Sequence, residues 1–328
     1  MVAEMKLSIR NVQIKTLQTI FESIKDLVIH TVNLEFAREG MSLMCMDGSH
    51  VAMVHLLLEA SGFMAYSCEE PRSIGIRVSD ILFAIKACRN SDELQMQIPA
   101  NETTLYFRGI PQEGQKHVTI SLQSLDAESE RYVIPPCKWS QTVEMNTKDL
   151  KEIIRTFDFT DALHIKWADK LLTFSGKEDN KYAEILVNTL VEEAPEQTHA
   201  NAAPSVPMPG ANPAMPSVPD LPSWNALQEG DKHATQAEKP KPLAKAFETN
   251  VPVEASYSIK YLKWITKNEP LGGGVVRLML EPDFPLAMTY HILHWGELTF
   301  LLNTSVEDDM DDDEYVPMDC DNGPMPFD

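Results

Sequence analysis

Apolar residues follow two different periods along the chain, and these periods predict a repeated order of strands and helices. Leu17, Ile20, Phe21 and Ile24 have the i, i+3, i+4, i+7 spacing of one helix face, which predicts a helix over residues 11–27. A strand is predicted before this helix at 5–10, and strands are predicted after it at 31–36, 42–46, 51–58 and 63–68. A strand, a helix and then several strands thus form the first module of a strand-helix-strand-strand-strand repeat.

The same order of elements recurs three more times. The second module has strands at 72–78, 94–98, 103–108 and 117–122 and a helix at 79–88. The third has strands at 141–145, 163–167, 171–175 and 182–188 and a helix that Asn146 or Thr147 caps and that ends at Phe157. The fourth has strands at 253–258, 275–281, 286–292 and 298–302 and a helix at 259–266. Four copies indicate an internal repeat.

Pairing the modules predicts an α+β chain of two similar domains, residues 1–124 and 137–304, joined by a connector at 125–136. Two segments do not fit this repeat. Residues 191–245 contain ten prolines and Trp224 as their single aromatic residue, so they are predicted to be a disordered insertion in the second domain. Residues 305–328 hold ten acidic residues and neither Lys nor Arg, which predicts a disordered acidic tail.

Charge is distributed unevenly. With 28 Lys and Arg against 49 Asp and Glu, the net charge of −21 argues against nucleic acid wrapping the outer surface. Positive residues nevertheless gather on the predicted helices, where Lys260, Lys263 and Lys267 lie opposite Leu262 and Ile265. For a single helix, the simpler interpretation of such a stripe is an ordinary solvated face. If the helices lie side by side, the stripes would form one basic surface that contacts DNA phosphates and makes no sequence-specific contact with bases.

A hairpin over residues 43–63 carries a sequence resemblance. Met46-Asp47-Gly48-Ser49-His50-Val51, then an apolar strand and Gly62-Phe63, closely resembles a hallmark stretch of the proliferating cell nuclear antigen (PCNA) family of DNA sliding clamps. The resemblance extends to 25–27, 85–90, 261–267 with 270–271, 285–286, and 296–298 leading to 307–308.

The resemblance implies a DNA clamp fold, in which three subunits form a ring with helices on the inner face and sheets outside. It implies a DNA polymerase processivity factor and docking platform for replication and repair proteins, which encircles double-stranded DNA and is opened by an ATP-dependent clamp loader. Such a protein is a nuclear homotrimer without enzymatic activity, cofactor or membrane association. A cytoplasmic replication site of a large DNA virus is the alternative location.

Site residues follow from the resemblance and the helix stripes together. The resemblance places Lys25, Lys86, Arg155, Lys260 and Lys267 in the DNA channel, and the stripes add Arg89, Lys148, Lys151 and Lys263. The family has further lysines where this chain has Gln18, Thr19 and Phe83, so the first two helices are less basic than in the family.

The resemblance also implies two protein-binding regions. A pocket for partner peptides is expected at Met46, His50, Val51, Met53, Leu125, Ile134, Phe284, Pro285, Leu301 and Leu302. Subunits are expected to pair head to tail through strand edges that carry His117, Thr119, Ser121, Tyr182, Glu184 and Leu186. Beside the pocket, Asn303 and Thr304 replace a proline and an alanine of the family.

Other classes of protein find less support. Five scattered cysteines contain no Cys-x-x-Cys pair, which argues against a disulfide framework or zinc site, and no apolar run reaches the about 18 residues of a membrane span. Gly272-Gly273-Gly274 lacks the Lys of a phosphate loop, and residues 308–314 lack the glycine of a calcium loop. The alternatives are a subunit of a heteromeric checkpoint-type clamp, a monomeric polymerase accessory protein, and a metal-dependent hydrolase, which no paired carboxylates on the predicted helices or strands support.

Overall fold

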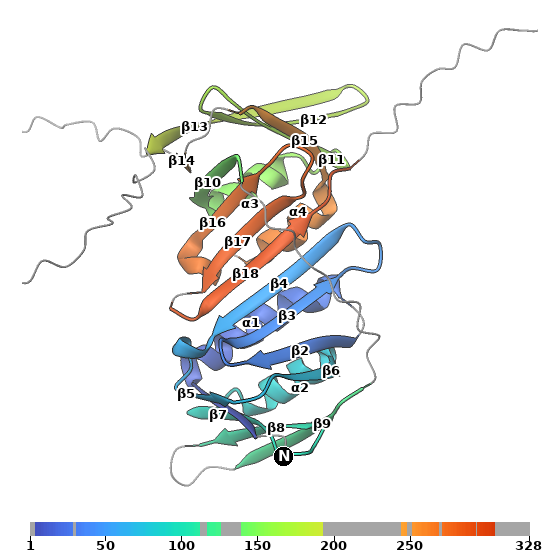
Figure 1. The fold of residues 1–328 in the computed structure, drawn as a ribbon. Coiled ribbons are helices and arrows are strands. Elements are labelled where there is room, and N and C mark those ends of the chain that lie inside the picture. Colours follow the sequence, from blue (N-terminus) through green and yellow to red (C-terminus); the bar gives the residue numbers. More distant parts are fainter. Residues whose placement is uncertain are drawn as a thin grey trace, which may run out of the picture. The chain divides into compact units, whose positions relative to one another are not determined.

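The order of helices and strands in the structure follows the predicted fourfold repeat (Figure 1). The structure, a computed structural model, describes residues 4–28, 31–111, 117–125, 139–192, 244–247, 251–268, 271–292 and 294–305. All of them belong to one compact unit made of Met1–Glu192 and Pro242–Asp328. The boundary between residues 1–124 and 137–304 stays a prediction, because the described part of the chain is not divided there.

Each of the four described α-helices follows directly on a strand. They are α1 (Asn11–Leu27), α2 (Val78–Cys88), α3 (Thr147–Thr156) and α4 (Ile259–Ile265), with 3-10 turns η1 (Ala60–Gly62), η2 (Thr266–Asn268) and η3 (Leu271–Gly274). The predicted apolar face of α1 is buried. Asn146, rather than Thr147, caps α3, because its side chain accepts a hydrogen bond of 2.8 Å from the backbone N–H of Lys148.

Five strands form the first sheet, in the order β5-β1-β7-β8-β9. Their bounds are β1 (Met5–Arg10), β5 (Ala65–Cys68), β7 (Glu93–Ile98), β8 (Thr104–Ile110) and β9 (Val118–Gln123). Every pairing in this sheet is antiparallel. Strand β9 is an edge, so one side of its backbone pairs with no other described strand.

Thirteen strands form the second sheet, in the order β15-β11-β12-β13-β14-β10-β16-β17-β18-β4-β3-β2-β6. The early strands are β2 (Thr31–Ala37), β3 (Gly40–Met46), β4 (Ala52–Glu59) and β6 (Arg72–Arg77). The later ones are β10 (Gln141–Asn146), β11 (Ala162–Ala168), β12 (Leu171–Glu178), β13 (Lys181–Glu192), β14 (Ala244–Phe247), β15 (Val253–Ser258), β16 (Val275–Leu280), β17 (Leu286–Ile292) and β18 (Gly296–Leu302). Antiparallel pairing of β18 with β4 joins the late and early strands.

The ends of the predicted disordered insertion need correction. Strand β13 continues to Glu192, and β14 begins at Ala244, so both ends of the segment 191–245 are in strands. These ends pair in parallel, with Thr189 opposite Ala244 and Glu192 opposite Phe247. Pairing between segments so distant in sequence leaves no local signal, which is why composition alone missed it. The rest of the insertion, like the connector from residue 126 and the tail from residue 306, lies outside the described residues.

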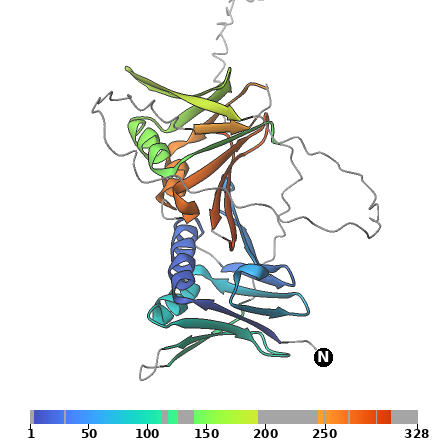
Figure 2. The same cartoon turned by 90° about the vertical axis from the view of Figure 1, so that its left-hand side faces the viewer.

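Helices and sheets form two layers. Figure 2 shows α3, α4, α1 and α2 following one another in a column, with the strands beside this column and beyond its two ends. The strands bury alternate residues, as in β4, where Val54, Leu56 and Leu58 are fully buried. The expected α+β architecture, with helices on one face of the sheets, is confirmed.

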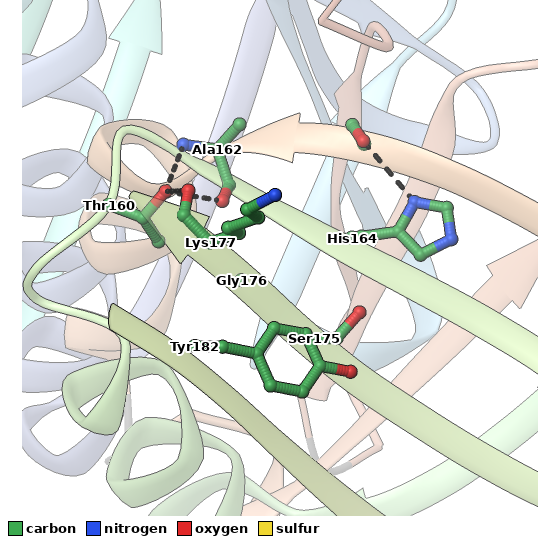
Figure 3. A pocket seen from close by; sticks show the side chains of 8 residues that line it. Thr160, Ala162, His164, Ser175, Gly176, Lys177 and Tyr182 are labelled. Atoms are coloured by element: carbon green, nitrogen blue, oxygen red, sulfur yellow. Dashed lines mark hydrogen bonds between the residues drawn. The ribbon is translucent and has the colours of Figure 1, made fainter. Parts of the chain in front are cut away.

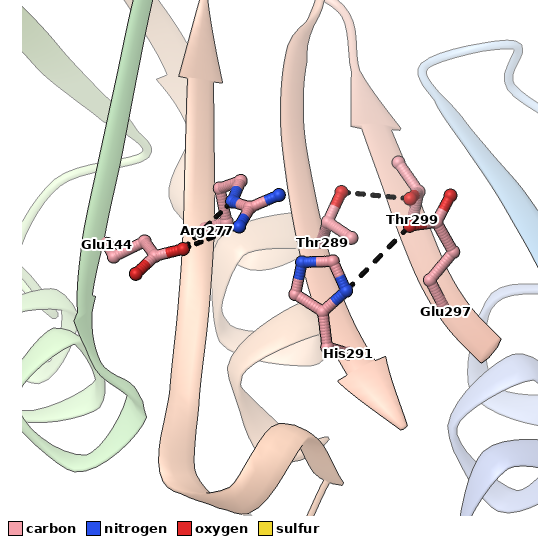
Figure 4. A network of polar contacts seen from close by, with 6 residues as sticks. All are labelled: Glu144, Arg277, Thr289, His291, Glu297 and Thr299. Atoms are coloured by element: carbon pink, nitrogen blue, oxygen red, sulfur yellow. Dashed lines mark hydrogen bonds and ion pairs between the residues drawn. The ribbon is translucent and has the colours of Figure 1, made fainter. Parts of the chain in front are cut away.

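A row of polar residues runs across five neighbouring strands of the second sheet, from β10 to β4. Glu144, Arg277, Thr289, Thr299 and His55 are successive cross-strand partners on β10, β16, β17, β18 and β4. Arg277 donates to one Glu144 oxygen from Nε at 3.0 Å and from Nη2 at 2.6 Å, and the hydroxyls of Thr289 and Thr299 lie 2.9 Å apart (Figure 4). Such matched pairs help to set the register of the strands.

Candidate functional site

The cations expected to contact DNA lie on the helix layer, where all of them are exposed or half-buried. Lys25 is on α1, Lys86 on α2 and Arg89 is its C-cap; the others are Lys148, Lys151 and Arg155 on α3, Lys260 and Lys263 on α4, and Lys267 on η2. Contacts link α2 to α1, α1 to α4, and α4 to α3. The helices that carry these exposed cations are therefore direct neighbours, as a surface that contacts successive phosphates requires.

Aromatic rings of α4 hold one of these lysines over the helix. The Lys260 ammonium lies 4.9 Å from the centroid of the Trp264 ring and 6.0 Å from that of Tyr261. A cation placed over a ring face is attracted to its negative quadrupole. The contact restricts Lys260 while leaving its charge exposed to solvent.

Two apolar side chains stand exposed on the helices. Phe83 on α2 is 61% exposed and Val12 on α1 is 75% exposed. Phe83 occupies a position where the resemblance leads one to expect lysine, so α2 contributes Lys86 but no second ammonium there. The lower positive charge inferred for the first two helices is thus accompanied by an exposed apolar side chain.

Ion pairs join each helix to its neighbour. Lys86 Nζ on α2 lies 2.8 Å from a carboxylate oxygen of Glu22 on α1, and Lys267 Nζ lies 3.2 Å from that of Asp26. Lys263 Nζ on α4 lies 2.8 Å from a carboxylate oxygen of Asp158, just after α3. Pairs this exposed contribute about 0–1 kcal/mol each to stability. The sequence pattern does not predict them, because each pair joins two segments that are far apart in the sequence.

Asp47 forms a buried hydrogen-bonded centre at the hairpin turn, which sequence reasoning missed. Only 6% of Asp47 is exposed. Its carboxylate accepts backbone hydrogen bonds from Ser49 at 3.1 Å, Val51 at 2.8 Å and Ala52 at 2.7 Å. It also accepts a bond of 2.7 Å from the phenol of Tyr261 on α4. One side chain thus fixes the turn and ties it to the lysine-bearing helix.

Burial and hydrogen bonding act in opposite directions on the Asp47–Tyr261 pair. Burial disfavours the Asp47 carboxylate, but its hydrogen bonds from Ala52, Tyr261, Ser49 and Val51 together outweigh burial and hold its pKa below the usual value. Burial and the bond to Asp47 both raise the pKa of Tyr261. At neutral pH the phenol therefore donates and the carboxylate accepts.

Three expected pocket residues are direct neighbours across strands. Met46 on β3 pairs with Met53 on β4, and Met53 pairs with Leu301 on β18. Because cross-strand partners share a face, the three form one apolar row. Val51 is half-buried beside this row, and exposed His50 has Nδ1 3.1 Å from the Met46 sulfur.

Asn303 is hydrogen-bonded to the segment just before β4, beside the apolar row, and the sequence did not predict this role. Its backbone N–H donates to the Val51 carbonyl at 2.9 Å, and its side-chain amide donates to the His50 carbonyl at 3.0 Å. A proline at this position could not donate the first bond. The departure from the family pattern therefore adds a link between β18 and the start of β4.

The remaining pocket residues lie in different settings. Phe284 and Pro285 are half-buried in the turn before β17. Leu302 is fully buried, so it supports the row from beneath and does not line a surface. Leu125 is 40% exposed, and its N–H donates to the Gly75 carbonyl on β6 at 2.8 Å. Ile134 lies outside the described residues.

Both strand edges expected at a subunit interface are present. His117, Thr119 and Ser121 are exposed on or beside edge strand β9. Residues 181–188 of β13 pair with β12, and pairing with β14 begins only at Thr189, so the second edge of 181–188 has no partner among described strands. Glu184 is exposed there, with Tyr182 64% and Leu186 57% exposed.

A shallow hollow of about 160 Å³ lies on β11, β12, β13 and β15 (Figure 3). Its lining includes His164, whose Nδ1 lies 3.3 Å from Ser256 Oγ, and Thr160, whose hydroxyl donates to the Ala162 carbonyl at 3.0 Å. The polar groups of His164 and Thr160 are thus already hydrogen-bonded to other groups of this chain. The hollow also lies beside the open edge of β13, so we assign it no ligand.

Among the residues that the structure describes, no three His, Cys, Asp or Glu side chains cluster as metal ligands would. No helix among the same residues is long and apolar enough to cross a membrane.

Comparisons with known proteins agree with the fold. Residues 6–131 match the model of the proliferating cell nuclear antigen N-terminal domain. Proliferating cell nuclear antigen of Dictyostelium discoideum is 25% identical over 300 residues, which cover 91% of this chain and 98% of the relative. That of Caenorhabditis elegans is 27% identical over 295 residues, which cover 89% of this chain and 94% of the relative. The chain is thus similar to PCNA over about nine-tenths of its length, and its strand and helix layers have the architecture of the α+β clamp fold.

Proposed function

We propose that this protein is a DNA sliding clamp that encircles duplex DNA, acts as a polymerase processivity factor and docks replication and repair proteins. The observation that carries the proposal is the placement of adjoining cationic stripes on the helix layer, while the docking hairpin belongs to the sheets. The protein acts by binding and is not an enzyme. Its partners are double-stranded DNA, peptide motifs of polymerases and repair proteins, and an ATP-dependent loader, and it works in the nucleus.

Sliding follows from the chemistry of the helix surface. Lysine ammonium groups on flexible stems contact phosphates, which repeat identically along the duplex whatever its sequence. A surface without base contacts has no preferred register, so binding energy changes little as the DNA moves. Affinity is then set by charge and falls steeply as salt rises.

Ring closure is proposed to pair the β9 edge of one subunit with the 181–188 edge of the next. The exposed Tyr182 and Leu186 side chains on that edge would be covered by the contact. We propose that this heterologous contact closes three subunits into a homotrimeric ring. The proposal of a heteromeric or monomeric relative is not favoured, since the similar proteins are PCNAs.

We expect Leu186→Glu to break the trimer into monomers, because it places a charge in an edge-to-edge contact. Light scattering behind a sizing column should give about three times the 36.9 kDa chain mass for the unsubstituted protein and the chain mass for the variant. Val275→Glu is the matched control, since Val275 is 44% exposed on β16 and should not affect assembly. A trimeric Leu186→Glu variant would place the interface elsewhere.

We expect Met53→Ser to weaken binding of a peptide with aromatic anchors by about tenfold or more, because it removes the middle of the apolar row. Met44→Ser is the control, since Met44 is half-buried on β3 opposite His55, outside the row. Fluorescence anisotropy of a labelled peptide measures both. Equal affinities of the two variants would contradict docking at this row.

A further inference from the structure

Three of the lysines proposed to meet DNA are already in contact with carboxylates of this chain. Glu22 meets Lys86 between α1 and α2, and Asp26 meets Lys267 between α1 and η2. Asp158 meets Lys263 between the end of α3 and α4. One lysine and one acid therefore link α2 to α1, α1 to the η2 turn that follows α4, and α4 to the end of α3.

These acids lie on the DNA-facing surface itself. The Glu22, Asp26 and Asp158 side chains are 44%, 49% and 63% exposed, and their lysine partners are 49%, 57% and 38% exposed. The hydrogen bond from Lys86 is the largest influence on Glu22 and lowers its pKa, so Glu22 is ionised at neutral pH. Each pair presents one negative and one positive charge to solvent.

A phosphate that reaches one of these lysines must compete with the carboxylate already there. It also comes close to that carboxylate, and like charges repel across such short distances. The pairs are exposed, so phosphate can separate them without opening a buried core. The carboxylates thus reduce the attraction of the helix surface for DNA without abolishing it.

We propose that Glu22, Asp26 and Asp158 are affinity-lowering residues of the DNA-facing surface, which hold three lysines in helix-to-helix pairs that duplex phosphates must displace. This inference rests on the proposed function. Weak, quickly exchanged phosphate contacts permit movement along the duplex, whereas a surface with all its lysines available would bind more tightly and move more slowly.

The test is the triple variant Glu22→Gln, Asp26→Asn, Asp158→Asn, which keeps side-chain size and removes three negative charges. The control triple variant Glu35→Gln, Glu178→Gln, Glu254→Gln changes net charge equally on exposed positions of β2, β12 and β15. Anisotropy of a short fluorescent linear duplex, measured over a salt series with both full-length variants and the unsubstituted protein, gives the affinity and its salt dependence.

We expect the helix-surface variant to bind about tenfold more tightly than the unsubstituted protein at low salt, with a steeper salt dependence by about one to two in the log-log slope. The control should change affinity by less than about threefold, because its charges are distant and screened. If the helix-surface triple does not fold, its three single variants should each show a smaller increase.

Other outcomes separate the inference from the proposed function. Equal affinities of the two triple variants, with clear binding by the unsubstituted protein, would overturn the inference and leave the clamp function standing. No duplex binding by any of the three proteins at low salt would overturn both.

Discussion

Replacing Asp47 by Ala is expected to lower the free energy of unfolding by about 3–5 kcal/mol. The substitution removes the acceptor of three backbone N–H groups and of the Tyr261 phenol in a site that is 6% exposed. Each buried donor left without a partner loses about 1–3 kcal/mol, and partial access of water reduces the sum. Urea unfolding followed by circular dichroism measures the difference.

The variant Tyr261→Phe distinguishes the stability contributed by the hydrogen bond to α4 from that contributed by the bonds within the turn. It removes one of the four hydrogen bonds to Asp47 and leaves the three within the turn, so we expect a loss of about 1–2 kcal/mol. If Asp47→Ala were no more destabilising than Tyr261→Phe, the turn bonds would contribute nothing, contrary to their geometry.

Acid should remove the contribution of Asp47. Its pKa is lowered in the folded state, so its ionised form stabilises the fold above the unfolded carboxyl pKa, and this stabilisation is lost as pH falls through the lower folded value. The difference in stability between the unsubstituted protein and Asp47→Asn should therefore be constant near neutral pH and shrink below about pH 4. A difference that grew on acidification would contradict this assignment.

Reversing Lys260, Lys263 and Lys267 to Glu is expected to weaken duplex binding about 100-fold or more at low salt. Three phosphate contacts become three repulsions, so the log-log salt slope should also become shallower by about three. Stimulation of a DNA polymerase should fall in parallel. Anisotropy across a salt series and primer extension measure these effects.

The matched control reverses lysines away from the helices. Lys6→Glu, Lys166→Glu, Lys170→Glu makes the same change in net charge at exposed positions of β1, β11 and the turn after it. Circular dichroism should show both variants folded, because all three α4 and η2 side chains are exposed or half-buried. Equal weakening by the two variants would mean that overall charge, rather than the helix stripe, governs binding.

Local patterns predicted most of the fold. The apolar face of α1 and the alternation in β4 are set by residues a few positions apart, and the structure buries both as expected. The parallel pairing of β13 with β14 was missed because its partners, such as Thr189 and Ala244, are separated by the proline-rich segment. A pairing between such distant segments cannot be predicted from the periodicity of nearby residues.

In the candidate site, too, features that depend on nearby residues could be predicted, whereas features that depend on distant residues could not. The lysine stripe of α4 is visible in the spacing of Lys260, Lys263 and Lys267, whereas their partners are not. Asp26 and Lys267 are 241 positions apart, and Asp47 and Tyr261 are 214 apart. The Asp-Gly-Ser sequence predicts a tight turn, but it does not predict the hydrogen bonds that the Asp47 carboxylate accepts. Only the packing of α4 against the hairpin reveals the fourth bond.

Retention on a blocked linear duplex tests encirclement most directly. The protein is allowed to thread onto a duplex tethered at one end, the free end is then capped with a bulky protein, and the sample is washed in high salt. A clamp that encircles DNA should remain on the capped duplex and leave when a restriction enzyme cuts off the cap. Equal loss from capped and uncapped duplexes would contradict encirclement and leave only ordinary electrostatic binding.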